Sequence, residues 1–315
     1  MSEPAPDISV IIPFYNEEAS LAELHSRLTE VLAPMGLASE LIFVDDGSTD
    51  GSNRVVKRLR EADGRIRLIS FRRNVGKSAA LAIGFRTVKG RYVVTIDADL
   101  QDDPAEIPRL LAHLEEGYDL VSGWKKTRRD PLSKTIPSRL FNLVTGLLSG
   151  IHLHDFNCGL KIYRREAVDE IELFGERHRF IPVLAHSQGF RVGELPVKHH
   201  PRKYGRTKYG AYRFVAGFFD LITLLFRMKF LTKPLHLFGG LGLISFLLGA
   251  GILVYLTVGW FQGRWIGNRP ILMIGILGVV TGLQLFTMGL LGEMIAEGFS
   301  RRSAQLPIRE DSDLD

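Results

Sequence analysis

The sequence predicts an α/β domain with a doubly wound, mostly parallel sheet, followed by a hairpin of two transmembrane helices. In the first third of the chain, apolar runs of strand length alternate with helical patterns, which is typical of parallel sheets covered by helices on both faces. Near the C-terminus, 30 residues from Pro234 to Gly263 and 23 residues from Pro270 to Gly292 contain no Asp, Glu, Lys or Arg. Each stretch is long enough to cross a hydrocarbon core of about 30 Å as a helix.

The first strands and helices are indicated by two different apolar periods. Ile8 to Pro13 is an almost continuous apolar run, as expected for a strand covered on both faces. Four leucines that recur every three or four residues then predict an amphipathic helix: Leu21, Leu24, Leu28 and Leu32. A second strand is expected from Glu40 to Val44, and Ser48-Thr49-Asp50 are good N-caps for the helix that follows it.

A third strand is expected from Arg65 to Ser70, and a fourth begins at Tyr92. Between them, Gly76-Lys77-Ser78 resembles the end of a P-loop, but a P-loop needs glycine where this chain has Phe71. The segment after the first strand, Pro13 to Glu17, also contains no glycine. We therefore expect a bound nucleotide to be held by side chains and a metal rather than by a glycine-rich cradle.

The fourth strand leads into Asp97-Ala98-Asp99-Leu100-Gln101, the stretch that organises the functional interpretation. Ligands of open α/β sheets bind at the carboxyl ends of the strands. Residues two apart on a continuing strand share one face, so Asp97, Asp99 and Gln101 could reach the same hard cation. The alternative for any one carboxylate is that it solvates a turn or caps a helix.

The second half of the domain adds a helix and two strands, expected at Pro104 to Glu116, Asp119 to Gly123 and Leu160 to Tyr163. A basic run that includes Lys125, Arg128 and Arg129 is either a solvated loop or a site for an anionic head group. The four cations between Arg202 and Tyr209 are either a positive-inside signal or a loop that closes over phosphates.

The expected domain organisation follows from these patterns. We expect a catalytic domain at residues 1–210, an interfacial helix at 211–233, a membrane region at 234–295 with spans at about 235–261 and 270–292, and a tail at 296–315. Five cations flank the two spans on the outside and two lie between them, in the loop. This bias places the catalytic domain and both termini in the cytoplasm, at the inner or cell membrane. The formal net charge of +5 is a mild excess, and no nucleic acid partner is expected.

Six motifs occur in order along the chain: Pro13-x-Tyr15-Asn16-Glu17, Val44-Asp45-Asp46-Gly47-Ser48-x-Asp50, Arg73-Asn74-x-Gly76-Lys77, Asp97-x-Asp99-x-Gln101, Asp155 with Gly159, and Arg202-x-x-Gly205-x-Thr207-Lys208. In this combination the sequence resembles the family-2 glycosyltransferases of the GT-A fold. Within them it is similar to the polyprenyl-phosphate sugar transferases, which include dolichyl-phosphate mannose synthase and bacterial undecaprenyl-phosphate glucosyl and aminoarabinosyl transferases. The two apolar spans resemble the bacterial branch.

The resemblance implies roles for individual residues. Nucleotide-sugar binding is implied for Pro13, Tyr15, Glu17, Asp45, Asp46, Lys77, Asp97 and Gln101. A divalent ion, Mg²⁺ or Mn²⁺, is implied at Asp97, Asp99 and Gln101. Catalytic roles are implied for Asp99, for Asp155 in the sugar pocket, and for Arg202 and Lys208, which would close over the phosphates. Arg128, Arg129 and Arg202 are the expected contacts of the acceptor phosphate.

The implied reaction is an inverting transfer of a hexose from a nucleotide sugar to a polyprenyl phosphate on the cytoplasmic face of the membrane. A phosphate ester is mostly dianionic at neutral pH, so the acceptor needs no general base. The bacterial branch favours UDP-glucose, and GDP-mannose, UDP-N-acetylglucosamine and UDP-aminoarabinose remain alternative donors.

Two other functions are weighed against this one. A processive polysaccharide synthase would carry Gln-x-x-Arg-Trp, whereas here Gln188 to Arg191 is followed by Val192. A membrane scaffold would use the glycines of the first span for close helix contact, and these glycines also suggest a homo-oligomer. The scaffold hypothesis leaves the Asp97-x-Asp99 stretch unexplained.

Overall fold

The computed structural model describes residues 5–126, 142, 144–147, 149–171, 173, 177–201, 203–204, 234–265 and 270–300. The chain divides into two compact units, Met1–Asp220 and Leu221–Asp315. The expected interfacial helix at 211–233 and the basic residues Arg128, Arg129, Arg202 and Lys208 lie outside the described residues. The proposed domain boundaries therefore remain predictions.

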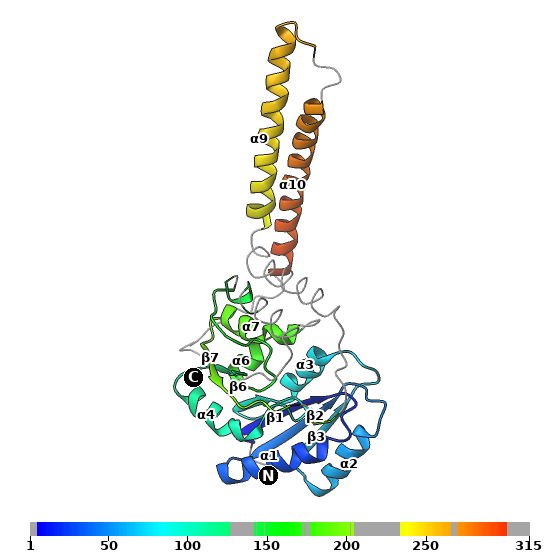
Figure 1. The fold of residues 1–315 in the computed structure, drawn as a ribbon, viewed down its shortest axis with the longest axis vertical. Helices are drawn as coiled ribbons and strands as arrows, with labels where there is room; N and C mark the ends of the chain where they lie inside the picture. The colour runs from blue at the N-terminus through cyan, green and yellow to red at the C-terminus, as the bar shows by residue number, and fades with distance from the viewer. Residues whose placement is uncertain are drawn as a thin grey trace. The chain divides into compact units, whose positions relative to one another are not determined.

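The first unit is built on a mixed sheet that has seven strands in the described part of the chain, in the order β3-β2-β1-β4-β6-β5-β7 (Figure 1). The strands are β1 (Ile8–Phe14), β2 (Ser39–Asp45), β3 (Ile66–Ser70), β4 (Tyr92–Thr95), β5 (Leu120–Trp124), β6 (Lys161–Arg164) and β7 (Val192–Pro196). Strand β1 pairs in parallel with β2 and β4, and β2 with β3. Strand β6 runs antiparallel to both β4 and β5, whereas β7 is parallel to β5. The predicted doubly wound, mostly parallel sheet is confirmed.

Helices cover both faces of this sheet, as the apolar runs predicted. They are α1 (Leu21–Leu32), α2 (Ser52–Ala62), α3 (Lys77–Thr87), α4 (Ile107–Glu115), α6 (Arg165–Glu170) and α7 (Ile181–Ser187), with short 3-10 turns at Ala33–Met35, Pro104–Glu106 and Arg177–Phe180. Neighbouring residues of β1 serve opposite faces: Val10 and Ile12 pack in the core beneath α1, and Ile11 packs in the core beneath α3. The central strands are therefore buried on both sides, and their carboxyl ends emerge at one edge of the sheet.

The predicted caps of α2 are only partly right. Gly51 holds the N-cap position, and no side chain caps the helix from there. Asp50 Oδ1 still accepts a hydrogen bond from the Ser52 amide at 2.9 Å. Ser48 and Thr49 instead bond to Asn16 in the loop after β1.

The second unit is an antiparallel hairpin of α9 (Pro234–Phe261) and α10 (Pro270–Ser300), which cover both expected spans (Figure 1). Glycines let the two backbones meet. A Cβ added at Gly249 would lie 2.6 Å from the Val279 amide nitrogen, and one at Gly282 would lie 2.6 Å from the Phe246 amide nitrogen. Ser245 Oγ donates to the Gly278 carbonyl at 2.9 Å. These contacts are internal to the hairpin, so the predicted homo-oligomer stays a prediction.

The outer surface of the hairpin is apolar. Two helices in the described part of the chain, Pro234–Phe261 and Pro270–Ile295, are long and apolar enough to cross a membrane. Only 17% and 11% of their most apolar windows are buried. A core helix of a soluble protein would be mostly buried, so this exposure favours contact with lipid.

Candidate active site

Two loops at the carboxyl edge of the sheet, one after β1 and one after β2, are joined by side-chain hydrogen bonds. Asn16, which has a φ of 52°, accepts at its Oδ1 from the backbone amides of Thr49 at 2.7 Å and Asp50 at 3.3 Å. The Glu17 amide donates to Ser52 Oγ at 2.9 Å. Asn tolerates the left-handed conformation better than most residues, which explains its use at this position. The predicted nucleotide ligands Tyr15 and Glu17 are thereby held beside the loop that follows β2.

Asp45 is the last residue of β2, Asp46 follows it directly, and both are buried. Asp45 accepts from the Ser48 amide at 2.8 Å and from Asn53 Nδ2 at 2.9 Å. Asp46 accepts from the backbone amides of Val75 at 2.7 Å and Gly76 at 3.0 Å. Burial raises the pKa of Asp46, and the two amide hydrogen bonds oppose this shift.

The loop that Asp46 holds leads directly into α3. Gly76 is the N-cap of α3, and Lys77 is the first residue of the helix. Gly47 has a φ of +72°, and a Cβ there would lie 2.3 Å from the Arg73 carbonyl carbon, so glycine is needed for this close approach. Asp46 and Gly47 together fix the position of Lys77 at the edge of the sheet.

The loop after β4 differs from the sequence-based expectation. Strand β4 ends at Thr95, and Leu100 turns the chain with a φ of 61° and a side chain that is 2% exposed. Asp97, Asp99 and Gln101 therefore do not alternate along one face of a continuing strand, because the apolar Leu100 is drawn into the core. The three residues remain within a single turn.

Each of these three side chains has its own neighbour in the structure. Asp97 Oδ1 forms an ion pair with Lys77 Nζ. Asp99 Oδ1 accepts from the Gln101 amide at 3.2 Å, and Gln101 Nε2 lies 3.5 Å from His199 Nε2. Asp97 faces the pocket described next, whereas Asp99 and Gln101 are not among the residues that line it.

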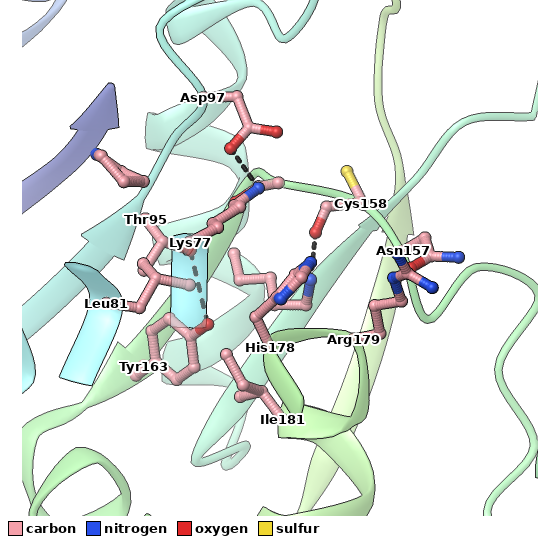
Figure 2. Close-up of a pocket in the computed structure, with 13 residues that line it drawn as sticks. Lys77, Leu81, Thr95, Asp97, Asn157, Cys158, Tyr163, His178, Arg179 and Ile181 are labelled. Carbon is pink, nitrogen blue, oxygen red and sulfur yellow. Dashed lines mark hydrogen bonds and ion pairs between the residues drawn. The ribbon is translucent and has the colours of Figure 1, made fainter. Parts of the chain in front are cut away.

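A pocket lies beside Asp97 (Figure 2), with about 300 Å³ of empty space when the solvent at its open mouth is included. It brings together three of the predicted site residues, Pro13, Lys77 and Asp97. In Figure 2, Lys77 and Asp97 point toward each other, and Asn157 and Arg179 are drawn on the opposite side of the pocket. The pocket therefore has the predicted nucleotide-binding edge on one side and residues from the second half of the domain on the other.

Sequence reasoning missed several residues of this pocket. Lys161 on β6 is 3% exposed, its Nζ donates to the Cys158 carbonyl, and burial lowers its pKa. His178 Nδ1 lies 2.9 Å from Ser78 Oγ, which ties the turn carrying Arg179 to α3. A lysine in a short strand resembles a surface residue in the sequence. Residues two apart in a strand lie on the same face of the sheet, so Lys161 shares its face with the aromatic Tyr163. This was the one available sequence signal that the Lys161 side chain points into the domain.

Asp155 is fully buried and lies immediately before the pocket-lining segment Asn157–Gly159. Its Oδ1 accepts from the Asn157 amide at 3.0 Å. Nearby, the Trp124 ring stacks on His154 with centroids 4.1 Å apart, and His154 pairs with Glu194. The predicted sugar-pocket residue Asp155 is therefore close in sequence to the pocket-lining segment and is held in a fixed position.

A buried charged cluster lies behind the same segment. Asp102 is 1% exposed, and its Oδ1 lies 2.9 Å from Lys125 Nζ and 3.9 Å from His199 Nδ1. Burial acts to raise the pKa of Asp102, but Lys125 and His199 hold it below the usual range. Burial raises the pKa of the Cys158 thiol to about 12, so Cys158 is a packed thiol rather than a nucleophile. Lys125 belongs to the basic run predicted as either a solvated loop or a site for an anionic head group, and its side chain is largely buried in an ion pair with Asp102.

Four predicted site residues, Arg128, Arg129, Arg202 and Lys208, lie outside the described residues, so the structure does not test their assignments. The described residues on both sides of Arg202 are held in place. Lys203 Nζ contacts Glu23 Oε2 on α1 at 2.8 Å, and the His200 amide donates to the Gln101 carbonyl at 2.8 Å. The chain before Arg202 is therefore anchored next to the Asp97–Gln101 turn.

Comparison with known proteins gives consistent results. Residues 9–172 match the family model described as glycosyl transferase family 2. Dodecaprenyl-phosphate galacturonate synthase of Rhizobium johnstonii is 39% identical over 304 residues, covering 95% of this chain and 90% of that protein. Undecaprenyl-phosphate 4-deoxy-4-formamido-L-arabinose transferase of Pseudomonas aeruginosa is 39% identical over 298 residues, covering 93% of this chain and 86% of that protein.

Solved structures with the same fold include glucosyl-3-phosphoglycerate synthase of Mycobacterium tuberculosis, crystallised with Mn²⁺ and UDP-glucose. Its TM-score is 0.55 at 22% identity, over 71% of this chain and 79% of that chain. At this level of identity, the likeness supports the fold alone. The strand order, the matched residues and the full-length relatives agree: the chain belongs to glycosyl transferase family 2 and is a glycosyltransferase with a GT-A fold.

Proposed function

We propose that this glycosyltransferase moves a sugar from a nucleotide sugar to a polyprenyl phosphate at the membrane surface. The observation that carries the proposal is the presence in one chain of the Asp97 pocket and of two exposed apolar helices of membrane-spanning length. A soluble acceptor would not require such a hairpin. The two relatives that match more than nine-tenths of the chain are named for prenyl-phosphate acceptors, which supports the same acceptor class.

The donor sugar is proposed as a class. The resemblance of the sequence favoured UDP-glucose, but the relatives are named for galacturonate and for 4-deoxy-4-formamido-L-arabinose. These two sugars differ in charge, since only galacturonate carries a carboxylate. The nucleotide donors of both therefore belong beside UDP-glucose in the set to be tested.

A divalent ion, Mg²⁺ or Mn²⁺, would be held by Asp97, Asp99 and Gln101. Carboxylate and amide oxygens suit such hard cations, and Asp97 lines the pocket in which the donor's diphosphate would lie. The described residues contain no group of three His, Cys, Asp or Glu side chains that could hold a metal, so the ligand set would also need the Gln101 amide oxygen or the donor's phosphates. When bound, the ion would neutralise charge that develops on the diphosphate leaving group.

The side chains of this chain would bind and orient the reactants. Lys77, placed at the start of α3 by Asp46, directs an ammonium group toward the Asp97 carboxylate and would donate to diphosphate oxygens once the donor is bound. Asp155, buried and held by the Asn157 amide, would position the sugar. The acceptor phosphate is already mostly dianionic at neutral pH. In-line attack on the anomeric carbon would therefore invert its configuration without a general base.

The acceptor side of the mechanism involves residues that the structure does not describe. We propose that Arg128, Arg129 and Arg202 bind the lipid phosphate and that Lys208 closes over the donor's phosphates. The excess of cations outside the two spans supports a cytoplasmic position for the catalytic domain and both termini. The nucleotide donor and the lipid phosphate would then meet on the cytoplasmic face.

The test uses the full-length protein in detergent micelles with undecaprenyl phosphate, Mg²⁺ or Mn²⁺, and a panel of nucleotide sugars. The panel includes UDP-glucose, UDP-N-acetylglucosamine, GDP-mannose, UDP-galacturonate and UDP-4-deoxy-4-formamido-L-arabinose. The expected product, identified by mass spectrometry, is one sugar linked to the lipid phosphate, with release of one nucleoside diphosphate. Formation of a sugar polymer would favour a polysaccharide synthase. No binding of any nucleotide would favour a scaffold.

A further inference from the structure

We propose that Lys161, to which none of the sequence motifs assigns a role, binds an oxygen of one of the two phosphate groups between which the sugar moves. The proposal rests on the proposed function, in which these groups are the β-phosphate of the nucleotide sugar and the phosphate of the polyprenyl acceptor. Lys161 is the first residue of β6, and it lines the pocket beside Asp97.

The ammonium group of Lys161 is buried without a carboxylate partner. Lys161 is 3% exposed, and its Nζ donates to the Cys158 carbonyl. In the part of the chain that the structure describes, no carboxylate forms an ion pair with it. A lysine ammonium has three N–H donors, and burying this charge without a counter-ion is costly. An anion in the pocket would supply the missing charge and accept a further hydrogen bond.

The pocket wall carries more positive than negative charge. Three cationic residues line it, Lys77, Lys161 and Arg179, against one carboxylate, Asp97, which pairs with Lys77. Burial is the main cause that lowers the pKa of Lys161, and the nearby Lys77 ammonium adds to this effect more strongly than Asp155 or Asp97 opposes it. Because like charges repel at short range, an anion that contacts both lysines would stabilise them together.

The position and the width of the pocket favour a phosphate oxygen. One side carries Lys77, the predicted diphosphate contact, and the other carries Asn157–Gly159, the segment that follows Asp155. A phosphate group attached to the sugar would lie between these two sides. Inside its open mouth the pocket is narrow, with room for a group of about the size of one water molecule. A single phosphate oxygen fits such a space, whereas a whole sugar ring does not.

The two possible sources of that oxygen place Lys161 at opposite ends of the transfer. The bond between the anomeric carbon and the β-phosphate oxygen breaks, and its electron pair stays with the leaving diphosphate. A bond forms at the same carbon to an oxygen of the lipid phosphate. The Lys161 charge would therefore stabilise the leaving group in the first case and position the nucleophile in the second.

Arg164, the last residue of β6, shows what a structural cation on this strand looks like. Its Nε donates to the Tyr118 carbonyl at 3.1 Å, and its Nη2 lies 3.7 Å from Glu115 Oε1. Arg164 is not among the residues that line the pocket. It therefore offers a matched control on the same strand, with a carboxylate partner that Lys161 does not have.

The experiment measures binding of UDP and UMP in Mg²⁺ buffer by calorimetry, and KM and kcat for undecaprenyl phosphate, on the full-length protein in micelles. GDP and GMP replace the uridine nucleotides if the donor panel identifies GDP-mannose. Lys161→Gln keeps an N–H donor for the Cys158 carbonyl and removes the charge, whereas Lys161→Arg keeps the charge. Arg164→Met is the control.

Loss of one charge-assisted hydrogen bond typically weakens binding about 10- to 100-fold. If the oxygen belongs to the donor, Lys161→Gln should weaken UDP binding by this factor and leave UMP binding unchanged. If it belongs to the acceptor, Lys161→Gln should raise KM for undecaprenyl phosphate by a similar factor and leave UDP binding unchanged. Lys161→Arg should recover most of either loss, and Arg164→Met should bind both substrates like the wild type.

Thermal unfolding without nucleotide separates this role from a structural one. Because Lys161→Gln removes a buried, unpaired charge, it should unfold at the wild-type temperature or higher, although it binds its substrate less tightly. A lysine that only stabilises the fold would show the reverse, a lower unfolding temperature with wild-type affinity. Lys161→Met is a second uncharged variant if Lys161→Gln does not fold.

Wild-type UDP affinity together with wild-type KM for undecaprenyl phosphate in the folded, uncharged variant would overturn the inference and leave the proposed function standing. Equal losses for UDP and UMP with an unchanged KM would also overturn it. A wild-type protein that forms no lipid-linked sugar would overturn the proposed function instead, and the UDP and UMP affinities of Lys161→Gln would still decide the inference.

Discussion

Replacing Lys77 with Met is expected to slow sugar transfer strongly while leaving the fold intact. Lys77 Nζ and Asp97 Oδ1 form an ion pair whose side chains are 24% and 31% exposed. An exposed or partly exposed pair contributes less than about 1 kcal/mol to stability. A cation at the N-terminus of α3 is also opposed by the helix dipole, by roughly 0.3–1 kcal/mol. The two terms partly cancel, so the free energy of unfolding should change by less than about 1 kcal/mol.

The expected effect of Lys77→Met on the rate is larger. In the proposed mechanism, the ammonium group donates to the diphosphate as it gains charge, and losing one such donor typically lowers turnover by about 10²–10³. The assay measures the initial rate of lipid-linked sugar formation and thermal unfolding on the same preparation. Lys89→Met, at an exposed lysine just beyond α3, is the matched control. A folded Lys77→Met protein with near-normal turnover would refute the assignment.

Mn²⁺ affinity of the Lys77→Met protein distinguishes two causes of a rate loss. Lys77 competes with a cation for Asp97 Oδ1, so its removal should leave Mn²⁺ binding as strong as in the wild type or stronger. Weaker binding would mean that Lys77 acts by organising the metal loop rather than by contacting the diphosphate.

Three other predictions concern the fold. Cys158, the one cysteine of the chain, is 1% exposed, and burial raises its thiol pKa to about 12. A thiol reagent at pH 8 should therefore label it only after denaturation. Rapid labelling of the native protein would contradict this packing. The hydrogen bond from Arg65, and to a smaller extent the one from His25, lowers the pKa of Asp63. The ionised Asp63 side chain therefore stabilises the fold fully above its unfolded pKa of about 3.9, and this stabilisation is lost as the pH falls below that value. The difference in melting temperature between wild type and Asp63→Asn should accordingly stay constant from about pH 7 to pH 5 and shrink as the pH falls from about 4 to 2, and a difference that persists unchanged to pH 2 would argue against this pair. Gly282→Leu should lower the melting temperature in micelles, because its Cβ would lie 2.6 Å from the Phe246 amide nitrogen. The control Gly251→Leu should not lower it, because a Cβ at Gly251 would have no atom within 4 Å. Equal melting temperatures of the two variants would contradict the helix contact.

The strands that pack between helices were predictable from the sequence. The apolar runs at Ile8–Pro13 and Glu40–Val44 correspond to β1 and β2 within one residue at each end, because strands buried on both faces must be apolar throughout. The direction of β6 could not be read in the same way. Lys161–Arg164 has the same local pattern whether it runs parallel or antiparallel, and only its pairing with β4 and β5 in the folded sheet shows its direction.

The site was predictable in its residue types but not in its geometry. The carboxylates after β4 stood out because charged residues rarely follow a buried strand by chance. The turn at Leu100, however, depends on a core that exists only in the folded domain. Lys161 and Asp102 were missed for a related reason: buried charges have the same sequence signature as surface charges, and only tertiary contacts with Cys158 and Lys125 distinguish them.

The most direct test of the account is sugar transfer by Asp99→Ala in the full-length, membrane-inserted protein, compared with the wild type on the donor that the panel identifies. The account predicts that the wild type forms a lipid-phosphate-linked sugar and that Asp99→Ala forms none, although it still inserts in the membrane. Near-normal turnover by Asp99→Ala would contradict a catalytic site built on the turn after β4.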